Sequence, residues 1–275
     1  MSKNSLPFTK MAGAGNDFIV ISAQKGSNYK KLALKACDRS TGVGADGIIV
    51  LDNSKKIDYK MRIMHADGSE AEMCGNGVRC LAAYIVKNIK PGRKQFSIET
   101  LAGEILAEAK NETAHVRLSD PVGYQRDISI KVRNCPLKVQ FIDTGVPHAV
   151  VFVNGLTDVD VKNIGKQIRY HKAFQPKGTN VNFVEQVTAK LVAARTYERG
   201  VEDETKACGT GSVASAIVAY MQANPTILNK KHALMKVRTT GGEILQVTFD
   251  IIDGQPKNVW LKGSAVFVAE GIYFH

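Results

Sequence analysis

Apolar residues in the first half of the chain occur in short runs bounded by glycine, aspartate or asparagine. The runs cover residues 18–21, 47–51, 59–64, 96–98 and 104–107. Short apolar runs between such residues are typical of β-strands. The first half is therefore expected to be rich in strands.

Two longer segments have the periodicity of helices. After Cys74, apolar residues stand at Val78, Leu81, Ala82 and Ile85, which places them on one face of an amphipathic helix. Residues 213–221, which follow a second cysteine, are apolar on almost every side. A helix of that kind is buried, here inside a curled sheet. A third stretch, residues 30–38, is also helix-like.

The chain repeats itself in the same order and at nearly constant spacing. Residues 74–77 read Cys-Gly-Asn-Gly, and residues 208–211 read Cys-Gly-Thr-Gly. Residues 100–106 (Thr-Leu-Ala-Gly-Glu-Ile-Leu) recur as 239–245 (Thr-Thr-Gly-Gly-Glu-Ile-Leu). Weaker matches join 116–118 to 259–261 and 15–18 to 178–183. The series indicates two copies of one unit.

The repeat divides the chain into two halves. The first copy ends near Pro121, and Gly123 adds a second turn-forming residue at the join. We expect an N-terminal half over residues 1–125, joined by a C-terminal strand over 264–275, and a C-terminal half over 126–263. A length of 275 residues is compatible with two separate cores.

The composition is that of a soluble protein with packed cores, because 44% of the residues are apolar and 23% are charged. No apolar run approaches the roughly 20 residues that a membrane-spanning helix needs. The N-terminal segment also lacks the apolar stretch of a secretory signal. We therefore expect a cytoplasmic protein with no membrane partner.

The formal charge of +11 does not by itself indicate a nucleic-acid partner. The lysines lie in small groups without interleaved aromatic residues, and no recognition motif accompanies them. A solvated basic surface is the simpler interpretation, and no nucleic-acid binding is expected.

A glycine-rich segment resembles a nucleotide-binding motif in letters only. Residues 42–47 fit the pattern G-x-G-x-x-G, but a helix-like stretch precedes them and a predicted strand follows. A dinucleotide site needs the opposite order. We interpret the segment as a turn and expect no nucleotide cofactor.

The cysteines argue against disulfides and metal sites. The five are Cys37, Cys74, Cys80, Cys135 and Cys208, an odd number, with no C-x-x-C pair and no zinc-like spacing. For three of them, Cys37, Cys80 and Cys135, we expect the usual role of a small buried residue.

Cys74 and Cys208 differ from the others because each precedes a glycine-bracketed helix start in its own copy. Helix N-termini carry unpaired N–H groups and positive potential, which favour a thiolate and attract a carboxylate. If an approximate twofold axis relates the copies, the two helix starts face each other across a cleft. One thiolate can then remove an α-proton while the other thiol returns a proton to the opposite face. The N–H groups expected to hold the substrate α-carboxylate belong to Gly75, Asn76, Gly209 and Thr210.

Motifs along the whole chain support this chemistry. They are Gly15-Asn-Asp-Phe18, Gly42-Val-Gly-Ala-Asp46, Asp67-Gly-Ser-Glu70, Met73-Cys-Gly-Asn-Gly-Val-Arg-Cys80, Pro147-His148, Asn180, Tyr197-Glu-Arg-Gly-Val-Glu-Asp-Glu204 and Ala207-Cys-Gly-Thr-Gly211. On these motifs the chain resembles the diaminopimelate epimerase family of cofactor-independent amino-acid epimerases. The resemblance implies an α/β (α+β) fold with two pseudo-symmetric domains. Each domain would be a mixed, rolled β-sheet around a central helix, with the active site in the interdomain cleft.

The resemblance also implies roles for individual residues. Positions matching Cys74 and Cys208 are the catalytic acid and base, and those matching His148 and Glu198 tune their acidity. The substrate-binding positions are Asn16, His65, Gly75, Asn76, Asn180, Glu198, Arg199, Gly209 and Thr210. Arg199 is suited to pairing with a distal carboxylate. A purely structural role for His148 is the alternative.

As a whole, the resemblance implies interconversion of LL- and meso-diaminopimelate in lysine biosynthesis, with no metal or pyridoxal cofactor, by a homodimer. Three positions depart from the family pattern, namely Gly47, His65 and Val146. They concern the substrate rather than the thiols, so a racemase of another amino acid is the alternative. A relative that uses a carboxylate in place of thiols is disfavoured because both cysteines are present. A catalytically silent binding module is disfavoured for the same reason.

Overall fold

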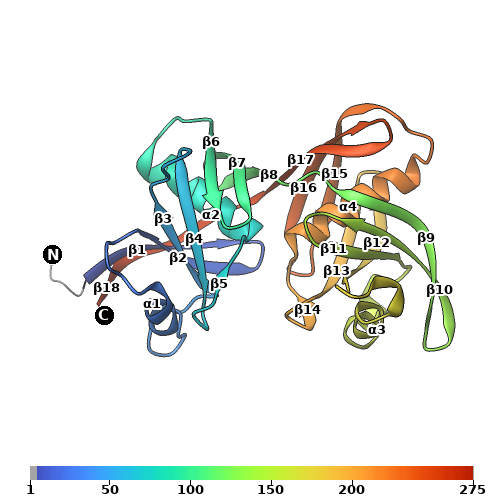
Figure 1. Ribbon diagram of the computed structural model, residues 1–275, viewed down its shortest axis with the longest axis horizontal. Coiled ribbons are helices and arrows are strands. Elements are labelled where there is room, and N and C mark those ends of the chain that lie inside the picture. The colour runs from blue at the N-terminus through green and yellow to red at the C-terminus, as the bar shows by residue number, and fades with distance from the viewer. Residues whose placement is uncertain (1–4, 275) are drawn as a thin grey trace. The chain divides into compact units, whose positions relative to one another are not determined.

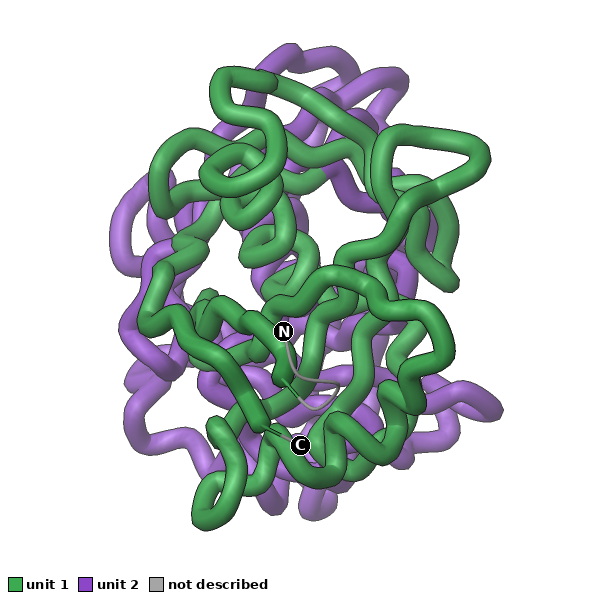
Figure 2. The backbone as a smooth tube through the Cα atoms, turned by 90° about the vertical axis from the view of Figure 1, so that its left-hand side faces the viewer, with its two compact units in different colours: residues 1–116, 262–275 green, residues 117–261 purple. Residues whose placement is uncertain are grey.

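The computed structural model describes residues 5–274, which form two compact units (Figure 1). Among these residues, unit 1 consists of 5–116 and 262–274, and unit 2 consists of 117–261 (Figure 2). The chain therefore passes from one unit to the other twice. No helix in the described part of the chain is both long and apolar enough to span a membrane.

Unit 1 contains a mixed sheet whose strands pair in the order β18, β1, β2, β3, β4, β6, β7. Its strands are β1 (Ser5–Gly13), β2 (Asn16–Ser22), β3 (Gly47–Asp52), β4 (Tyr59–His65), β5 (Glu70–Ala71), β6 (Gln95–Thr100), β7 (Gly103–Lys110), β8 (Thr113–Arg117) and β18 (Val266–Phe274). The pairs β2–β3 and β4–β6 are parallel, and the other neighbours in this order are antiparallel. Two further strands pair at its margin, β5 with β4 and β8 with β7.

Unit 2 contains a second sheet, in the order β9, β10, β11, β12, β13, β15, β16. Its strands are β9 (Val122–Val132), β10 (Cys135–Asp143), β11 (Pro147–Phe152), β12 (Asn180–Thr188), β13 (Leu191–Glu198), β14 (Asp203–Thr205), β15 (Lys230–Arg238) and β16 (Ile244–Ile252), followed by β17 (Gln255–Ser264). The pairs β11–β12 and β13–β15 are parallel and the others antiparallel. Strand β14 pairs with β13. Strand order and direction match unit 1 position by position, as the sequence repeat predicts.

Helices occupy equivalent places in the two units. Helix α1 (Tyr29–Ala36) connects β2 to β3, and α3 (Val161–Arg169) connects β11 to β12. Helix α2 (Gly75–Tyr84) follows β5, and α4 (Gly209–Ala223) follows β14. A π-helical turn, η1 (Ile85–Ile89), continues α2, and the short helices η2 (Leu156–Asp158) and η3 (Lys172–Phe174) flank α3.

The outer helices α1 and α3 begin at comparable side-chain caps. The side chain of Asn28 accepts the Lys31 N–H at 3.0 Å, and that of Asp160 accepts the Asn163 N–H at 3.2 Å. Such caps satisfy a helix N–H group that has no partner inside the helix.

The central helices α2 and α4 are wrapped by their own sheets. Helix α2 packs against β1, β2, β3, β4 and β7, and α4 packs against β10, β11, β12, β13, β15 and β16. Every residue from Asn76 to Ala83 and from Gly211 to Ala219 is buried. A helix contacted by strands across the width of a sheet lies inside a rolled sheet, which confirms the predicted fold class.

The outermost strand of each sheet has a different origin in the sequence. In unit 1 it is β18, the last strand of the chain, which pairs with β1. In unit 2 it is β9, which pairs with β10. Residues 117–125, which the sequence assigned to the first half, lie in unit 2, and residues 262–263, which it assigned to the second half, lie in unit 1.

One weak sequence match is wrong. Residues 15–18 lead into β2, the first strand of the parallel pair in unit 1, whereas 178–183 lead into β12, the second strand of the pair in unit 2. The register sets Phe18 beside Gly47 and His148 beside Asn180. Phe18 therefore corresponds to His148, and Gly47 corresponds to Asn180. A shared glycine and asparagine before an apolar run misled the comparison, whereas strand pairing fixes it.

Candidate active site

Cys74 is the N-cap residue of α2. Its backbone is extended (φ −141°, ψ 116°), and its carbonyl accepts the Val78 N–H at 2.8 Å, which starts the helix. The residue is half-buried. A side chain at Gly75 would meet no atom within 4 Å. No atom therefore packs over the start of α2 at Gly75, and the first N–H groups of the helix have no partner within the helix itself.

Cys208 occupies the same position in α4, with φ −121° and ψ 116°, and is buried. Its sulfur accepts the Gly211 N–H at 3.4 Å and lies 3.5 Å from Oγ1 of Thr210. A Cβ on Gly211 would lie 3.2 Å from that sulfur, so glycine permits the approach. An N–H donor and a helix N-terminus both favour a thiolate.

Glu198 lies at the end of β13, beside Cys208. Its carboxylate accepts a 3.0 Å hydrogen bond from Oγ1 of Thr205 and also bonds the Cys208 thiol. Burial raises the pKa of Glu198, and these two hydrogen bonds lower it in part. The carboxylate is thus placed to accept the thiol proton of Cys208.

The remaining side chains that the sequence assigned to unit 2 support one another. Asn180 donates to the Pro147 carbonyl at 3.0 Å and accepts the Arg199 N–H at 2.8 Å. The Arg199 guanidinium donates to the Lys177 carbonyl at 3.1 Å. The Thr210 carbonyl accepts from Oγ1 of Thr144 at 3.2 Å. Asn180 therefore holds the backbone that presents Arg199.

His148 lies on β11 and is fully buried. Burial, followed by the positive charge of Arg199, lowers the pKa of His148 to about 3. Its Nδ1 accepts a 3.0 Å hydrogen bond from the Asn182 side chain. His148 is thus neutral near pH 7, in contact with a residue that the sequence did not select.

In unit 1, four side chains form a directional series of hydrogen bonds at the start of α2. Buried Arg79 donates to Oδ1 of Asn76 at 2.9 Å, Asn76 donates to Oδ1 of Asn16 at 2.8 Å, and Asn16 donates to Asp46 at 2.9 Å. Nε of Arg79 also donates to the Ser264 carbonyl at 3.4 Å. The series fixes both amide groups, so it brings together two of the predicted substrate-binding residues.

Ion pairs extend this series to the surface. Arg39 pairs with Asp17 at 2.7 Å and with Asp46 at 2.9 Å, and Lys10 pairs with Asp17 at 2.9 Å. Burial alone would raise the pKa of Asp17, but the bonds from Arg39 and Lys10 lower it to about 2. Asp17 is therefore ionised throughout the neutral range.

Other predicted residues lie apart from these contacts. His65 is exposed at the end of β4 and pairs in register with Gly47. Val146 is half-buried just before β11. Gly209 is the first residue of α4. The role of each predicted residue toward substrate stays a prediction.

The cysteines outside the two helix starts are of two kinds. Cys37 and Cys80 are buried as expected, and burial together with Asp17 raises the pKa of Cys37 to about 11. Cys135 is exposed, which contradicts the expectation of burial. It begins β10 directly after the tight turn at Arg133 and Asn134, both with positive φ, so no core lies over it.

The described residues contain no disulfide. They also contain no group of three or more His, Cys, Asp or Glu side chains that could hold a metal ion.

Arg79 and Asn182 support the site, and neither was predicted. Each had a signal in the sequence: Arg79 stands between Val78 and Cys80 in the predicted helix, and Asn182 stands between Val181 and Phe183. Such residues hydrogen-bond internally when buried, but the sequence did not indicate to what.

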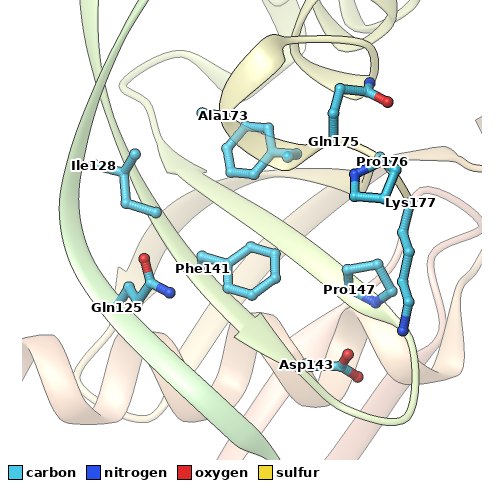
Figure 3. Close-up of a pocket in the computed structure, with 11 residues that line it drawn as sticks. Gln125, Ile128, Phe141, Asp143, Pro147, Ala173, Gln175, Pro176 and Lys177 are labelled. Atoms are coloured by element: carbon cyan, nitrogen blue, oxygen red, sulfur yellow. The ribbon is translucent and has the colours of Figure 1, made fainter.

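Unit 2 also has a surface pocket of about 250 Å³, lined by residues of β9, β10 and the segment around η3 (Figure 3). Phe141 and Phe174 stack in it, with ring centroids 5.9 Å apart, and Asp143 and Lys177 line it with polar groups. No residue of α4 lines this pocket. Its lining adjoins the predicted site at two residues: the Pro147 carbonyl accepts from the Asn180 side chain, and the Lys177 carbonyl accepts from Arg199.

Comparison with known proteins identifies the relatives of this chain. The sequence model of diaminopimelate epimerase matches residues 8–122 and 140–268. The chain belongs to the diaminopimelate epimerase family.

Proteins named diaminopimelate epimerase resemble the chain over almost its whole length. The protein from Hydrogenobaculum is 41% identical, with 96% of this chain and 97% of the relative covered. That from Aquifex aeolicus is 40% identical, with 97% of each covered. That from Methanocella arvoryzae is 44% identical, with 97% and 96% covered.

Solved structures share the fold at much lower identity. A phenazine biosynthesis protein of the PhzF family from Bacillus anthracis superposes with a TM-score of 0.73 at 16% identity, with 98% of each chain covered. A probable proline racemase from Agrobacterium radiobacter gives 0.69 at 14% identity, with 97% and 92% covered. The diaminopimelate epimerase family therefore shares its two-unit fold with proteins of different names.

Proposed function

We propose that this protein interconverts LL- and meso-diaminopimelate, with Cys74 and Cys208 as the two proton-transfer groups and no cofactor. The observation that carries the proposal is the equivalence of the two cysteines. Each is the N-cap of the buried central helix in its own unit, with the same extended backbone. Packing alone gives no reason for a thiol at both positions.

In the proposed reaction one cysteine acts as thiolate and the other as thiol. The thiolate removes the α-proton and becomes a thiol, and the resulting carbanion takes a proton from the second thiol on its opposite face. The second cysteine leaves the cycle as a thiolate, so protons and electrons balance. The reverse reaction exchanges the two roles.

The substrate α-carboxylate is proposed to lie against the helix starts. Their N–H groups and positive potential offset the charge that develops on the α-carbon and its carboxylate. These N–H groups belong to Gly75, Asn76, Gly209 and Thr210. The fixed amides of Asn16 and Asn76 support this arrangement in unit 1.

At the distal end of the substrate, Arg199 is proposed to pair with the second carboxylate. Asn180 holds the Arg199 backbone at 2.8 Å, so the arginine side chain extends from a fixed point. Glu198 and His148 are proposed to set the acidity of the thiols. The hydrogen bond between Glu198 and Cys208 supports this role for Glu198.

A homodimer and a cytoplasmic location complete the proposal. Strand β18 presents the exposed apolar side chains of Val268, Ile272 and Phe274. Apolar side chains on an outer strand favour association with another protein surface. Sedimentation of the purified protein should give twice the 29.9 kDa chain mass, and a monomer at micromolar concentration would exclude a stable dimer.

The deciding experiment is incubation of the reduced, chelator-treated protein with LL-diaminopimelate in deuterated water. We expect loss of the α-proton signal by NMR and appearance of the meso isomer on chiral chromatography. Cys74→Ala and Cys208→Ala should each abolish turnover. No exchange by folded wild-type protein with titratable thiols would overturn the proposal for this substrate.

The departures at Gly47, His65 and Val146 favour a second candidate, racemisation of another amino acid. The same deuterium assay with a panel of L-amino acids distinguishes the two. Exchange that requires a second carboxylate on the substrate supports the first candidate, and exchange without that requirement supports the second.

A further inference from the structure

The two helix starts that carry the cysteines pack against chemically different side chains. In register, Ile49 pairs with Ile63 in unit 1, and at the equivalent positions Asn182 pairs with Thr196 in unit 2. A Cβ on Gly77 of α2 would meet the methyl tips of Ile63 and Ile49, at 3.1 and 3.4 Å. The equivalent Cβ on Gly211 of α4 would overlap Oδ1 of Asn182. The start of α2 thus rests on two isoleucines and the start of α4 on a buried amide.

The orientation of the Asn182 amide is fixed by its partners. Its nitrogen donates to the Ala149 carbonyl at 3.2 Å and to Nδ1 of His148 at 3.0 Å, and its oxygen accepts from Oγ1 of Thr196 at 3.0 Å. A backbone carbonyl only accepts hydrogen bonds, so the nitrogen must lie on that side. Asn182 has no exposed surface.

This orientation decides which nitrogen of His148 carries the proton. Because the Asn182 nitrogen donates to Nδ1, Nδ1 is the acceptor and the proton of the neutral ring is on Nε2. Nε2 is buried and has no hydrogen-bond partner among the described residues. The fold therefore keeps a neutral donor at Nε2, and the equivalent of His148 in unit 1 is Phe18.

We propose that Asn182 is a positioning residue for proton transfer at Cys208 alone. It holds His148 in the Nε2–H form and places its own oxygen against the start of α4, next to the glycine that bonds the Cys208 sulfur. Unit 1 has no equivalent pair of hydrogen-bonding side chains, because Ile49 takes the position of Asn182 and Phe18 takes the position of His148. This inference rests on the proposed function, but its first two tests do not depend on which amino acid is the substrate.

The first test reads the tautomer in the wild-type protein and uses one variant to assign the signal. Protein labelled with ¹⁵N-histidine should show one ring that does not titrate near neutral pH and that has its proton on Nε2. Loss of that signal in His148→Gln assigns it. A proton on Nδ1, or a charged ring at pH 7, would overturn the proposal even in fully active enzyme.

The second test uses Asn182→Leu, which keeps the size of the side chain and removes its hydrogen bonds. Ile49→Leu is the matched control in unit 1. Alkylation of each cysteine is followed by mass spectrometry across a pH series. We expect the pH midpoint for Cys208 to move in Asn182→Leu by about half a unit or more, and that for Cys74 to stay. Midpoints that both move, or both stay, would contradict an effect confined to Cys208.

Activity supplies a third readout. If the proposed epimerisation holds, Asn182→Leu should lower kcat by about tenfold with little change in KM, because a proton-transfer group is misplaced while the substrate contacts remain.

Asn182→Asp serves as a second variant should the leucine variant fail to fold. Its carboxylate can only accept a hydrogen bond, here from Nδ1–H, so the NMR signal should switch to the Nδ1–H form. Retention of the Nε2–H signal in that variant would also refute the assignment.

Discussion

Arg79 donates a 2.9 Å hydrogen bond to Oδ1 of Asn76, one turn earlier in α2, and the guanidinium that makes it has no exposed surface. With its oxygen held in this way, Asn76 donates from its nitrogen to Oδ1 of Asn16, which orients the second amide. The arginine therefore sets how two amides near Cys74 point, although it was not among the predicted site residues.

Replacing Arg79 should harm both stability and activity. Arg79→Met removes the donor to Oδ1 of buried Asn76, and an unsatisfied buried polar group costs about 1–3 kcal/mol. It also removes the hydrogen bond from Nε of Arg79 to the Ser264 carbonyl and the packing of a fully buried side chain. We expect the free energy of unfolding, measured in urea, to fall by about 2–4 kcal/mol. Activity should fall further than the unfolded fraction explains.

Arg117→Met is the control, because Arg117 makes an exposed 3.1 Å hydrogen bond to Asn258. It should change stability by no more than about 0.5 kcal/mol. Equal losses in the two variants would mean that burial of the Arg79 network contributes nothing.

Alanine at the equivalent glycines Gly77 and Gly211 should have unequal effects. At Gly211 the new Cβ would overlap Oδ1 of Asn182 and lie 3.2 Å from the Cys208 sulfur. A shift of the helix away from one of these atoms would not relieve the contact with the other. At Gly77 its nearest neighbours would be the flexible ends of Ile63 and Ile49, at 3.1 and 3.4 Å, and Cβ of Cys74 at an ordinary contact distance of 3.6 Å. We expect Gly211→Ala to cost about 1–3 kcal/mol more than Gly77→Ala in urea unfolding. The opposite order would show that α4 can shift freely at its start.

His148 gives the stability a defined pH dependence. Its pKa is about 3 in the folded protein, against an ordinary value of 6.5. Between those values the unfolded chain binds a proton that the folded chain does not. The contribution of neutral His148 is therefore complete above pH 6.5 and is lost progressively as the pH falls toward 3.

His148→Gln should flatten this part of the stability profile. Each pKa unit corresponds to about 1.4 kcal/mol, so the wild type should lose a few kcal/mol more than the variant between pH 6.5 and pH 4. Urea unfolding at half-unit pH intervals measures the difference. Parallel profiles for the two proteins would mean that His148 is protonated in the folded state near its ordinary pKa.

The sequence predicted the parts of this structure that depend on local pattern. The strands near Ile48 and Met61, the central helices, and the cysteine before each helix all follow from apolar spacing and repetition. What it could not predict depends on pairing between distant segments. The C-terminal strand was expected beside the first half, and β18 lies there, paired with β1. The residue at which the chain leaves unit 1 and the correspondence of Phe18 to His148 were not predicted, because they are set by strand pairing and register, which the residues themselves do not state.

The same distinction applies to the candidate site: residues marked by a local motif were predicted, and residues that matter through distant contacts were not. Both helix-start thiols were predicted because their motif repeats. Arg79 and Asn182 were missed because their importance comes from particular hydrogen-bond partners brought close only by folding. Cys135 was predicted to be buried because cysteine most often is. It is exposed because it lies beside a tight hairpin turn.

The cysteines should differ in how alkylation affects activity. Cys135 is exposed and should react early with iodoacetamide at pH 7.5, without loss of activity. Cys37 should react last, because it is buried and a pKa of about 11 leaves very little thiolate. Inactivation should follow modification of Cys74 or Cys208, as read by peptide mass spectrometry. In Cys135→Ser the rate of inactivation should be unchanged. If that variant is protected, or if activity falls in step with Cys135 modification, the assignment of the reactive thiols to the helix starts is wrong.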